Sequence, residues 1–175
     1  MSDARRKHVL FWGLIGAWVT TDVLTKAWAV RGLTPRVPRE VFGELVRFTL
    51  IHNKGAAFGM HVGDWSRWVF TMLTLGALVM LAHLFRETRS GDTPRTLALA
   101  LVTGGAIGNL IDRILSSRGV VDFIDIGVQG WRFWTFNVAD VGVSCGAVLL
   151  ALVLWREERA QHAAATGGGT QSSAR

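Results

Sequence analysis

The sequence predicts an all-α integral membrane protein with four transmembrane helices and a small extracytoplasmic β-rich element. Three observations indicate this fold class. Half of the 175 residues are hydrophobic and only 18% are charged, which is less charge than a soluble domain carries. Four apolar segments each reach the length of about 20 residues that crosses a bilayer. Most of the eight Trp residues fall near the ends of these segments, as in the aromatic belt of membrane proteins.

The four predicted spans cover about 9–28, 66–85, 96–115 and 138–155. The first follows a basic cluster at Arg5–Lys7, as the apolar part of a signal peptide would. Asp22 and Lys26 stand where a small-residue cleavage site should be, so we expect this segment to be retained as a helix. With four spans both termini share one side of the membrane. The denser Lys and Arg residues near the termini predict that this side is the cytoplasm.

The segment between the first two spans, about 36–60, predicts the β-rich element. Its stretch EVFGELVRFTLIHN is rich in β-branched and aromatic residues and alternates in part between apolar and polar positions. A second strand candidate, VVDFIDI, lies in the third loop and is expected to pair with it. Residues 1–155 then form a single membrane domain, followed by a disordered cytoplasmic tail over 156–175 that is poor in apolar residues.

The composition argues against several classes of function. A net charge of +6 would suit nucleic acid, but the basic residues are scattered through short loops without a basic stripe, so no nucleic-acid binding is expected. The single cysteine, Cys145, precludes an intrachain disulfide and a cysteine-cluster metal site. Its apolar surroundings predict a buried position. The five histidines lack metal-ligand spacing, so we expect neither a metal nor another cofactor.

Ionisable residues near hydrocarbon are rare and usually functional, and here the polar residues form five short clusters. In the first, TTDVLTK, Asp22 and Lys26 stand four apart on one helical face. An exposed intrahelical ion pair is the structural alternative to a functional role for them. In the second, HNKGAAFG, Asn53 and Gly55 either lie beside an extended ligand or form an ordinary turn.

The third cluster, GGAIGNLIDR, lies in the third span. Gly104 and Gly108 have the small-xxx-small spacing that permits close helix packing. Asn109 and Asp112 point to one helical face, and Arg113 follows directly. A polar knot between helices is the structural alternative for this cluster.

The fourth and fifth clusters, VVDFIDI and FNVAD, supply carboxylates near a predicted membrane boundary. Strand alternation places Asp122 and Asp125 on opposite faces, so the two need not share an environment. Asp140 stands at the mouth of the last span, three residues after Asn137. Two carboxylates brought close cannot both ionise cheaply, so one can activate water while the other protonates the scissile carbonyl. Asp122 and Asp140 therefore predict aspartic peptidase chemistry, which needs no metal.

Taken in order, these motifs resemble those of the lipoprotein signal peptidases, the bacterial signal peptidase II family. The matching patterns are D-x-x-T-K, N-x-G-A-A-F, G-G-A-x-G-N-L-x-D-R, V-V-D-F-I-D and F-N-x-A-D. The resemblance implies an inner-membrane aspartic peptidase with a dyad of Asp122 and Asp140. Strand alternation is the reason that the neighbouring Asp125 is left outside the dyad. The positions that match the family's other motif residues around the substrate and the dyad are Asp22, Lys26, Asn53, Gly108, Asn109, Asp112, Arg113 and Asn137.

The resemblance also implies a substrate, a bacterial prolipoprotein whose lipobox cysteine carries a diacylglyceryl group and which is cut just before that cysteine. Such a lipidated signal helix can enter sideways from the membrane lipid into a site at the outer leaflet, and a monomer is sufficient. A small ion- or proton-coupled transporter is the main alternative, but it would need polar residues through the whole membrane depth. A structural subunit whose polar residues only hold helices together would not need five separate motifs.

Overall fold

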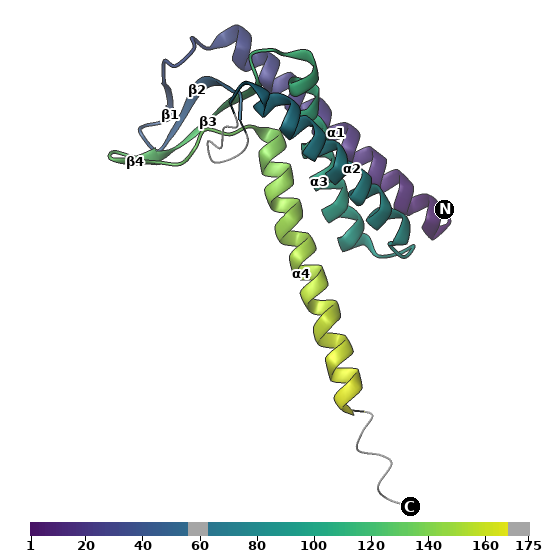
Figure 1. Cartoon of the computed structure of the whole chain (residues 1–175). Coiled ribbons are helices and arrows are strands. Elements are labelled where there is room, and N and C mark those ends of the chain that lie inside the picture. The colour runs from purple at the N-terminus through teal and green to yellow at the C-terminus, as the bar shows by residue number, and fades with distance from the viewer. Residues whose placement is uncertain (56–62, 168–175) are drawn as a thin grey trace, which may run out of the picture.

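The computed structural model describes residues 1–55 and 63–167 of the chain. Four long helices dominate it (Figure 1). They are α1 (Asp3–Gly32), α2 (Ser66–Glu87), α3 (Thr93–Leu115) and α4 (Val138–Gly167), and a short 3-10 turn, Gly63–Trp65, precedes α2. All four helices are long and apolar enough to cross a membrane, and each contains one of the predicted spans. The predicted class, four spans with a small sheet, is confirmed.

The sheet is formed by β1 (Arg39–Phe42), β2 (Val46–Asn53), β3 (Val120–Val128) and β4 (Trp131–Arg132). It is antiparallel, in the order β1-β2-β3-β4. The pairing of β2 with β3 joins the two strand candidates read from the sequence, and it places Ile51 opposite Asp122. Residues 56–60, the end of the predicted β-rich segment, lie outside the described residues.

Two apolar clusters hold the helices and the sheet together. One lies under the sheet, where it attaches β2 and β3 to the last turns of α1, and consists of Ala29, Leu33, Leu50, Val121 and Phe123. The other joins α1, α2 and α3 near the opposite end, and consists of Phe11, Ile15, Leu81, Phe85, Leu99 and Ala100. Helix α3 is central, since half of the residues in its most apolar 18-residue stretch are buried. The buried share of the corresponding stretch is 17% in each of the other three helices.

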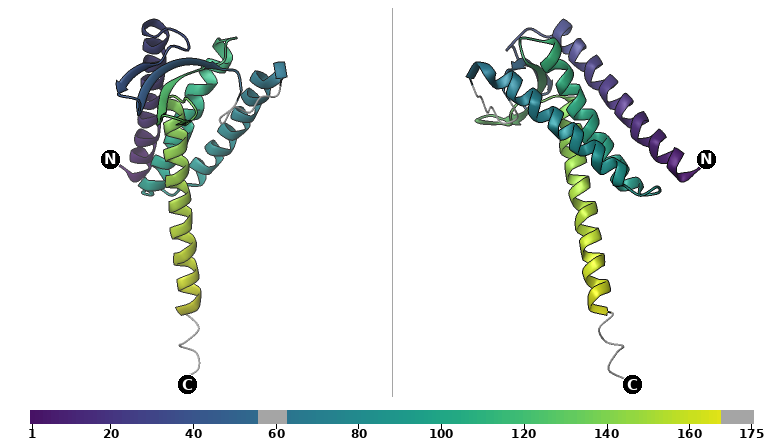
Figure 2. Two further views of the ribbon diagram at one scale, coloured as in Figure 1. Left: turned by 90° about the vertical axis from the view of Figure 1, so that its left-hand side faces the viewer. Right: turned by 45° about the vertical axis from the view of Figure 1, so that its right-hand side comes forward.

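Helix α4 packs along α3 and then extends beyond the ends of the other three helices (Figures 1 and 2). It continues to Gly167, so the expectation of a disordered tail from Arg156 is wrong for residues 156–167. An ion pair of 3.3 Å between Arg95 and Glu157 joins α4 to the first turn of α3, and the helix continues past this contact. Residues 168–175 of the expected tail lie outside the described residues.

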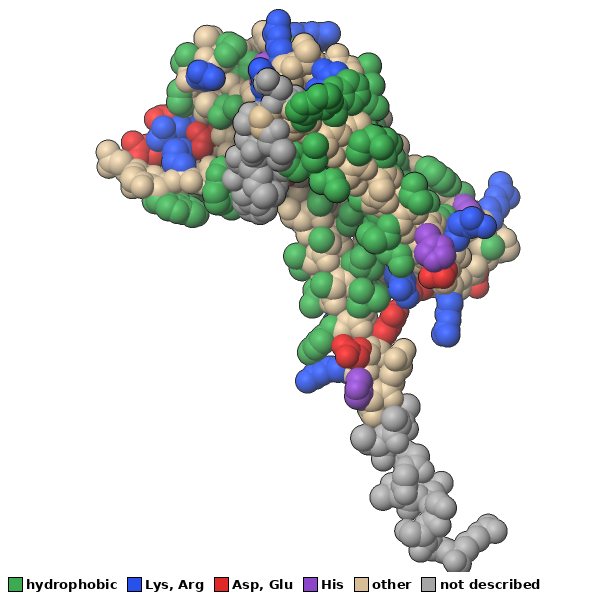
Figure 3. All heavy atoms as spheres, in the orientation of Figure 1, with side chains coloured by type: hydrophobic (Ala, Val, Ile, Leu, Met, Phe, Trp, Pro, Cys, Tyr) green, Lys and Arg blue, Asp and Glu red, His purple; other side chains and the backbone are tan. Residues whose placement is uncertain are grey.

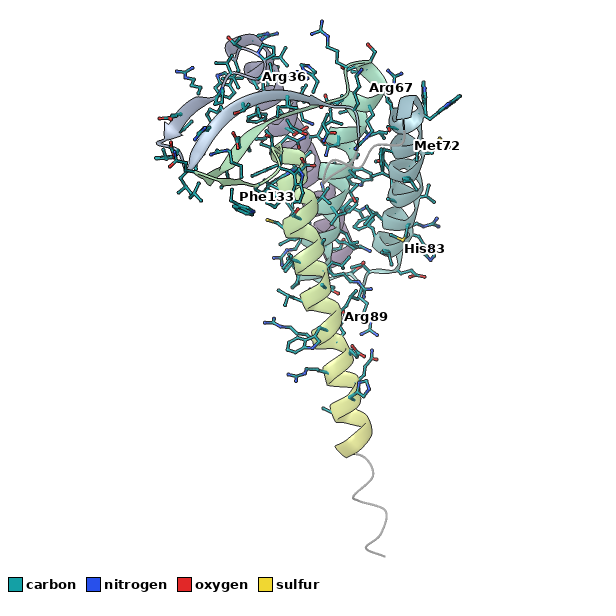
Figure 4. The ribbon with its side chains drawn as sticks, turned by 60° about the vertical axis from the view of Figure 1, so that its left-hand side comes forward. Arg36, Arg67, Met72, His83, Arg89 and Phe133 are labelled. Carbon is teal, nitrogen blue, oxygen red and sulfur yellow. The ribbon has the colours of Figure 1, made fainter. Side chains whose placement is uncertain are left out.

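The outer surface of the helices is apolar between two charged ends. Hydrophobic side chains cover the visible faces of α2 and α4, and charged side chains gather at the ends (Figure 3). Figure 4 places Arg36 and Arg67 at the sheet end and Arg89 at the opposite end. Cys145, expected to be buried, is exposed on α4, where a spanning helix meets lipid. The helices therefore present mainly apolar side chains to their surroundings.

Candidate active site

The FNVAD motif forms a reciprocal cap at the start of α4. The side-chain oxygen of Asn137 accepts a hydrogen bond of 2.9 Å from the backbone N–H of Asp140. In return, Oδ2 of Asp140 accepts one of 3.1 Å from the backbone N–H of Asn137. This is the geometry of a capping box, which satisfies two backbone donors at a helix N-terminus. The same bonds that begin the helix therefore fix the Asp140 carboxylate.

The side-chain amide of Asn137 joins the two predicted dyad members. It is fully buried and donates to Oδ1 of Asp122 over 2.7 Å. The same nitrogen lies 3.0 Å from Oδ1 of Asn109 and 3.2 Å from the carbonyl oxygen of Val121. Because the amide oxygen and the backbone N–H of Asn137 already bind Asp140, one residue contacts both carboxylates. The structure thus brings Asp122 and Asp140 together.

Asp122 lies on β3 in a nearly closed environment, with 3% of its surface exposed. Its second carboxylate oxygen accepts a hydrogen bond of 3.1 Å from the side-chain amide of Asn53 at the end of β2. Burial, and then the negative charge of Asp140, raise the pKa of Asp122 to about 7, against the lowering effect of the bonds from Asn53 and Asn137. Asp122 is therefore placed to hold a proton near neutral pH.

Asn53 also forms the turn that its sequence suggested. Its side-chain oxygen accepts a hydrogen bond of 2.9 Å from the backbone N–H of Gly55, as in an Asx turn. With the oxygen occupied in this way, the amide NH₂ group faces Asp122. The turn and the contact with Asp122 are thus made by one side chain, and the remainder of the motif, residues 56–59, lies outside the described residues.

Asn109 of α3 holds the Asp140 carboxylate from the other side. Its amide nitrogen donates to Oδ1 of Asp140 over 2.8 Å, and its oxygen accepts from the Lys26 ammonium over 3.0 Å. An ammonium can only donate, so Lys26 requires the oxygen of Asn109 to face α1 and leaves the NH₂ group for Asp140. Both carboxylate oxygens of Asp140 consequently accept N–H donors at a helix N-terminus, an arrangement that suits a charged carboxylate.

The ion pair of α1 is buried, so the alternative of an exposed intrahelical pair is wrong. The Lys26 nitrogen lies 2.7 Å from Asp22 and 3.0 Å from Asp112, and the side chains of Asp22 and Lys26 are 0% and 5% exposed. The other oxygen of Asp22 accepts a hydrogen bond of 2.8 Å from the backbone N–H of Ala139. Asp22 thus caps α4 from a neighbouring helix, and Lys26 balances its charge.

Glycines of α3 permit this close approach. A Cβ on Gly108 would stand 2.6 Å from Oδ2 of Asp22 and 3.1 Å from Cβ of Ala139, and one on Gly104 would stand 3.2 Å from Cβ of Trp18. The small-xxx-small spacing of Gly104 and Gly108 therefore permits close packing of α3 on α1. Gly105, which the spacing did not single out, faces α4, where a Cβ would stand 2.8 Å from Val143.

Asp112 and Arg113 lie in the last turn of α3, beside the predicted dyad. Oδ2 of Asp112 accepts a hydrogen bond of 3.1 Å from the backbone N–H of Val121, so it ties α3 to β3 one residue before Asp122. Asp112 therefore orders the strand that carries Asp122. Arg113 is half-buried, and its positive charge acts on Asp140, Asp122 and Asp112.

Asp125 belongs to a different polar group on the same strand. It accepts hydrogen bonds of 3.0 Å from Thr49 and 2.7 Å from Arg132, which stand on β2 and β4. Strand alternation predicted this separation from Asp122. Thr49 and Arg132 were not identified from the sequence, because their role depends on the pairing of distant strands.

One further side chain escaped the sequence analysis. The indole nitrogen of Trp18 donates a hydrogen bond of 3.0 Å to the carbonyl oxygen of Val138 at the start of α4. Trp18, Asp22 and Lys26 follow one another at intervals of four along one face of α1, which is the signal that could have identified it. Within the described ranges, no three His, Cys, Asp or Glu side chains are grouped so as to hold a metal.

Comparison with known proteins shows which family this chain is similar to. The family model described as signal peptidase II matches residues 14–156 of the chain. The lipoprotein signal peptidase of Hydrogenovibrio crunogenus is 43% identical over 136 residues, which cover 77% of this chain and 78% of that protein. The lipoprotein signal peptidase of Rhodococcus jostii is 37% identical over 154 residues, with coverages of 85% and 73%.

Two solved structures of bacterial membrane enzymes are similar in fold. One matches with a TM-score of 0.75 and 27% identity, covering 93% of this chain and 92% of the other. The second matches with a TM-score of 0.71 and 30% identity, covering 81% and 89%. The similarity thus extends over the helices and the sheet together.

Proposed function

Because the chain belongs to the signal peptidase II family, we propose that it removes signal peptides from bacterial prolipoproteins by aspartic catalysis with Asp122 and Asp140. The substrate is a prolipoprotein whose lipobox cysteine carries a diacylglyceryl group, and the bond before that cysteine is cut. One observation carries the aspartic mechanism. Asn137 is hydrogen-bonded to both carboxylates, which come from separate elements of the fold.

The surroundings of the two carboxylates divide the work between them. Asp140, with N–H donors on both oxygens, acts as the general base and takes a proton from the attacking water. Asp122, with a pKa of about 7, acts as the acid and gives its proton to the scissile carbonyl oxygen. When the tetrahedral intermediate collapses, Asp140 passes its proton to the leaving nitrogen and Asp122 recovers one from the intermediate's hydroxyl group.

The position of the dyad fits a substrate that comes from the membrane. Asp140 lies in the first turn of a spanning helix, and Asp122 lies in a strand beside the ends of α1 and α3. We place this end at the extracytoplasmic face of the bacterial inner membrane and both termini in the cytoplasm. The acyl chains of the substrate then lie in lipid while the peptide reaches water. A monomer is expected, because a single chain supplies every residue of the proposed site.

A small ion- or proton-coupled transporter is the weaker alternative. The Lys26 ammonium pairs with Asp22 and Asp112, and Asp122 is hydrogen-bonded to Asn53 and Asn137, all at one end of the helices. A proton or ion path would instead need ionisable groups along the depth of the membrane. The family assignment also favours the peptidase.

The rate of cleavage is expected to fall as the pH rises above about 7. Asp122 must be protonated to act as the acid, and its raised pKa of about 7 means that the acid form predominates below that pH and is lost above it. The measurement is kcat/KM for a diacylglyceryl prolipoprotein over about pH 5 to 9. Replacing Asn53 by alanine removes a hydrogen bond that lowers this pKa, so it should move the alkaline limb to higher pH. A rate that is level through this range would contradict the role given to Asp122.

Replacing Asp125 by asparagine is expected to leave kcat within about threefold of the unsubstituted protein, because this side chain does not contact the dyad. The variant keeps an oxygen for Arg132 but loses a charge, which should lower the free energy of unfolding by about 1–2 kcal/mol. Cleavage assays and thermal unfolding of the purified variant measure the two effects. Complete loss of cleavage in a folded variant would mean that the wrong aspartate of VVDFIDI had been assigned to the dyad.

A further inference from the structure

Trp18 occupies the junction of three helices directly beneath the proposed dyad. Its Cβ atom lies against Gly104 of α3, and its indole lies against Gly142 of α4. The indole N–H donates to the carbonyl oxygen of Val138, two residues before Asp140. Beyond this point α4 separates from α1 (Figure 2). The indole is thus a main contact by which α1 holds the start of α4.

The fit between Trp18 and Gly142 has no room for a larger residue. A Cβ at position 142 would stand 2.8 Å from Cε2 of the indole and 2.9 Å from Cδ1, and closer still to its nitrogen. Because ordinary carbon contacts are about 3.5–4.0 Å, either the indole or α4 would have to move. The hydrogen bond to Val138 resists movement of the indole, since an indole N–H among apolar helices needs a partner.

A shift of α4 would separate the two carboxylates, because they are carried by different parts of the fold. Asp122 is held by β3 and its bond to Asn53, whereas Asp140 and the capping residue Asn137 move with the first turn of α4. Gly142 lies within one helical turn of Asp140, so a displacement at position 142 is passed to the carboxylate. Misplacement of a reacting group by about 1 Å can lower a rate about a hundredfold.

We propose that Trp18 is a positioning residue for the dyad, whose indole, bonded to Val138 and packed on Gly142, sets the placement of Asp140 relative to Asp122. The inference rests on the proposed function, since it needs Asp140 to take part in the reaction. Trp18 touches neither carboxylate and acts only through the backbone of α4. It works beside Asp22, which binds the backbone N–H of Ala139 in the same turn.

The test is a double-mutant cycle in the purified full-length protein, with kcat, KM and thermal unfolding measured for each variant on a diacylglyceryl prolipoprotein. Gly142→Ala should lower kcat about 30-fold with KM within about threefold, and Trp18→Leu should lower kcat about fivefold. The double variant should lose no more than Trp18→Leu alone, because without the indole the new methyl group has space. Independent sites would instead multiply to about 150-fold. Gly16→Ala, which adds a methyl group in open space on α1, is the matched control.

The outcomes separate this inference from the proposed function. Multiplied losses in the double variant, or an unchanged kcat for folded Gly142→Ala, would overturn the role of Trp18. If Gly142→Ala does not fold, Trp18→Leu decides, since an unchanged kcat would overturn the role and a loss confined to kcat would support it. The proposed function itself would instead be refuted if the purified unsubstituted protein did not cleave, or if the Asp140→Asn variant cleaved normally.

Discussion

Asp140→Asn is expected to lower kcat about a thousandfold or more, because an amide cannot take a proton from the attacking water. Asp122→Asn should do the same, because an amide cannot supply the proton that the scissile carbonyl needs. Both replacements keep the size of the side chain. Each replaces a carboxylate oxygen that accepts a hydrogen bond by an NH₂ group, which cannot accept one from the same N–H donor. The lost hydrogen bond should reduce the free energy of unfolding by about 1–3 kcal/mol. The loss of activity should therefore far exceed the loss of folded protein.

The measurement is the single-turnover rate of prolipoprotein cleavage, with thermal unfolding of the same preparations. Asp125→Asn is the matched control, since it makes the same chemical change at a buried aspartate of the same strand. Normal cleavage by either dyad variant would refute the assignment of that carboxylate. Equal losses in all three variants would show that any charge removed from this region inactivates the protein.

Asn137→Ala is expected to give the second-largest effect, a loss of about a hundredfold in kcat together with about 1 kcal/mol of stability. The stability change follows from the lost cap, because the side-chain oxygen of Asn137 accepts the backbone N–H of Asp140. The loss in rate follows from the amide donor on Asp122, which is the shorter of the two hydrogen bonds that this carboxylate accepts, at 2.7 Å against 3.1 Å from Asn53.

Asn137→Ser separates these two roles. Serine is a good N-cap, so its hydroxyl oxygen should recover most of the melting temperature lost in the alanine variant. It lacks the amide NH₂ group that reaches Asp122, so kcat should stay low. A serine variant that recovers both stability and kcat would reduce Asn137 to a helix cap.

Much of this fold could be predicted from local sequence, because a bilayer imposes length and composition on the helices. The four spans and the pairing of β2 with β3 both followed from such patterns. The length of α4 was underestimated because apolar composition ends near Trp155, although residues 156–165, REERAQHAAA, are mostly strong helix formers that continue the helix. Helical propensity and hydrophobicity are separate signals, and only the second was read there.

The site was predicted as a set of residues and not as a network. Polar side chains in or near the spanning segments indicated its candidate members, since ionisable residues there rarely occur without a function. The cap between Asn137 and Asp140 is also local and could have been read from the spacing N-x-x-D. The bond from Asp22 to Ala139 joins residues 117 apart, and Trp18 meets Gly142 only after three helices pack. Such contacts depend on tertiary structure, so the spacing of Trp18, Asp22 and Lys26 indicates a shared face of α1 but not the partners of that face.

Asp122 and Asp140 are proposed to cut lipidated prolipoproteins without a metal. The most direct measurement incubates the purified protein with diacylglyceryl-modified and unmodified forms of one prolipoprotein, with and without a chelator, and determines the cleavage site by mass spectrometry. We predict cleavage of the modified form alone, immediately before the lipidated cysteine, at the same rate in the presence of chelator. Loss of cleavage on chelation would refute the metal-free mechanism, and equal cleavage of the unmodified form would refute the proposed substrate.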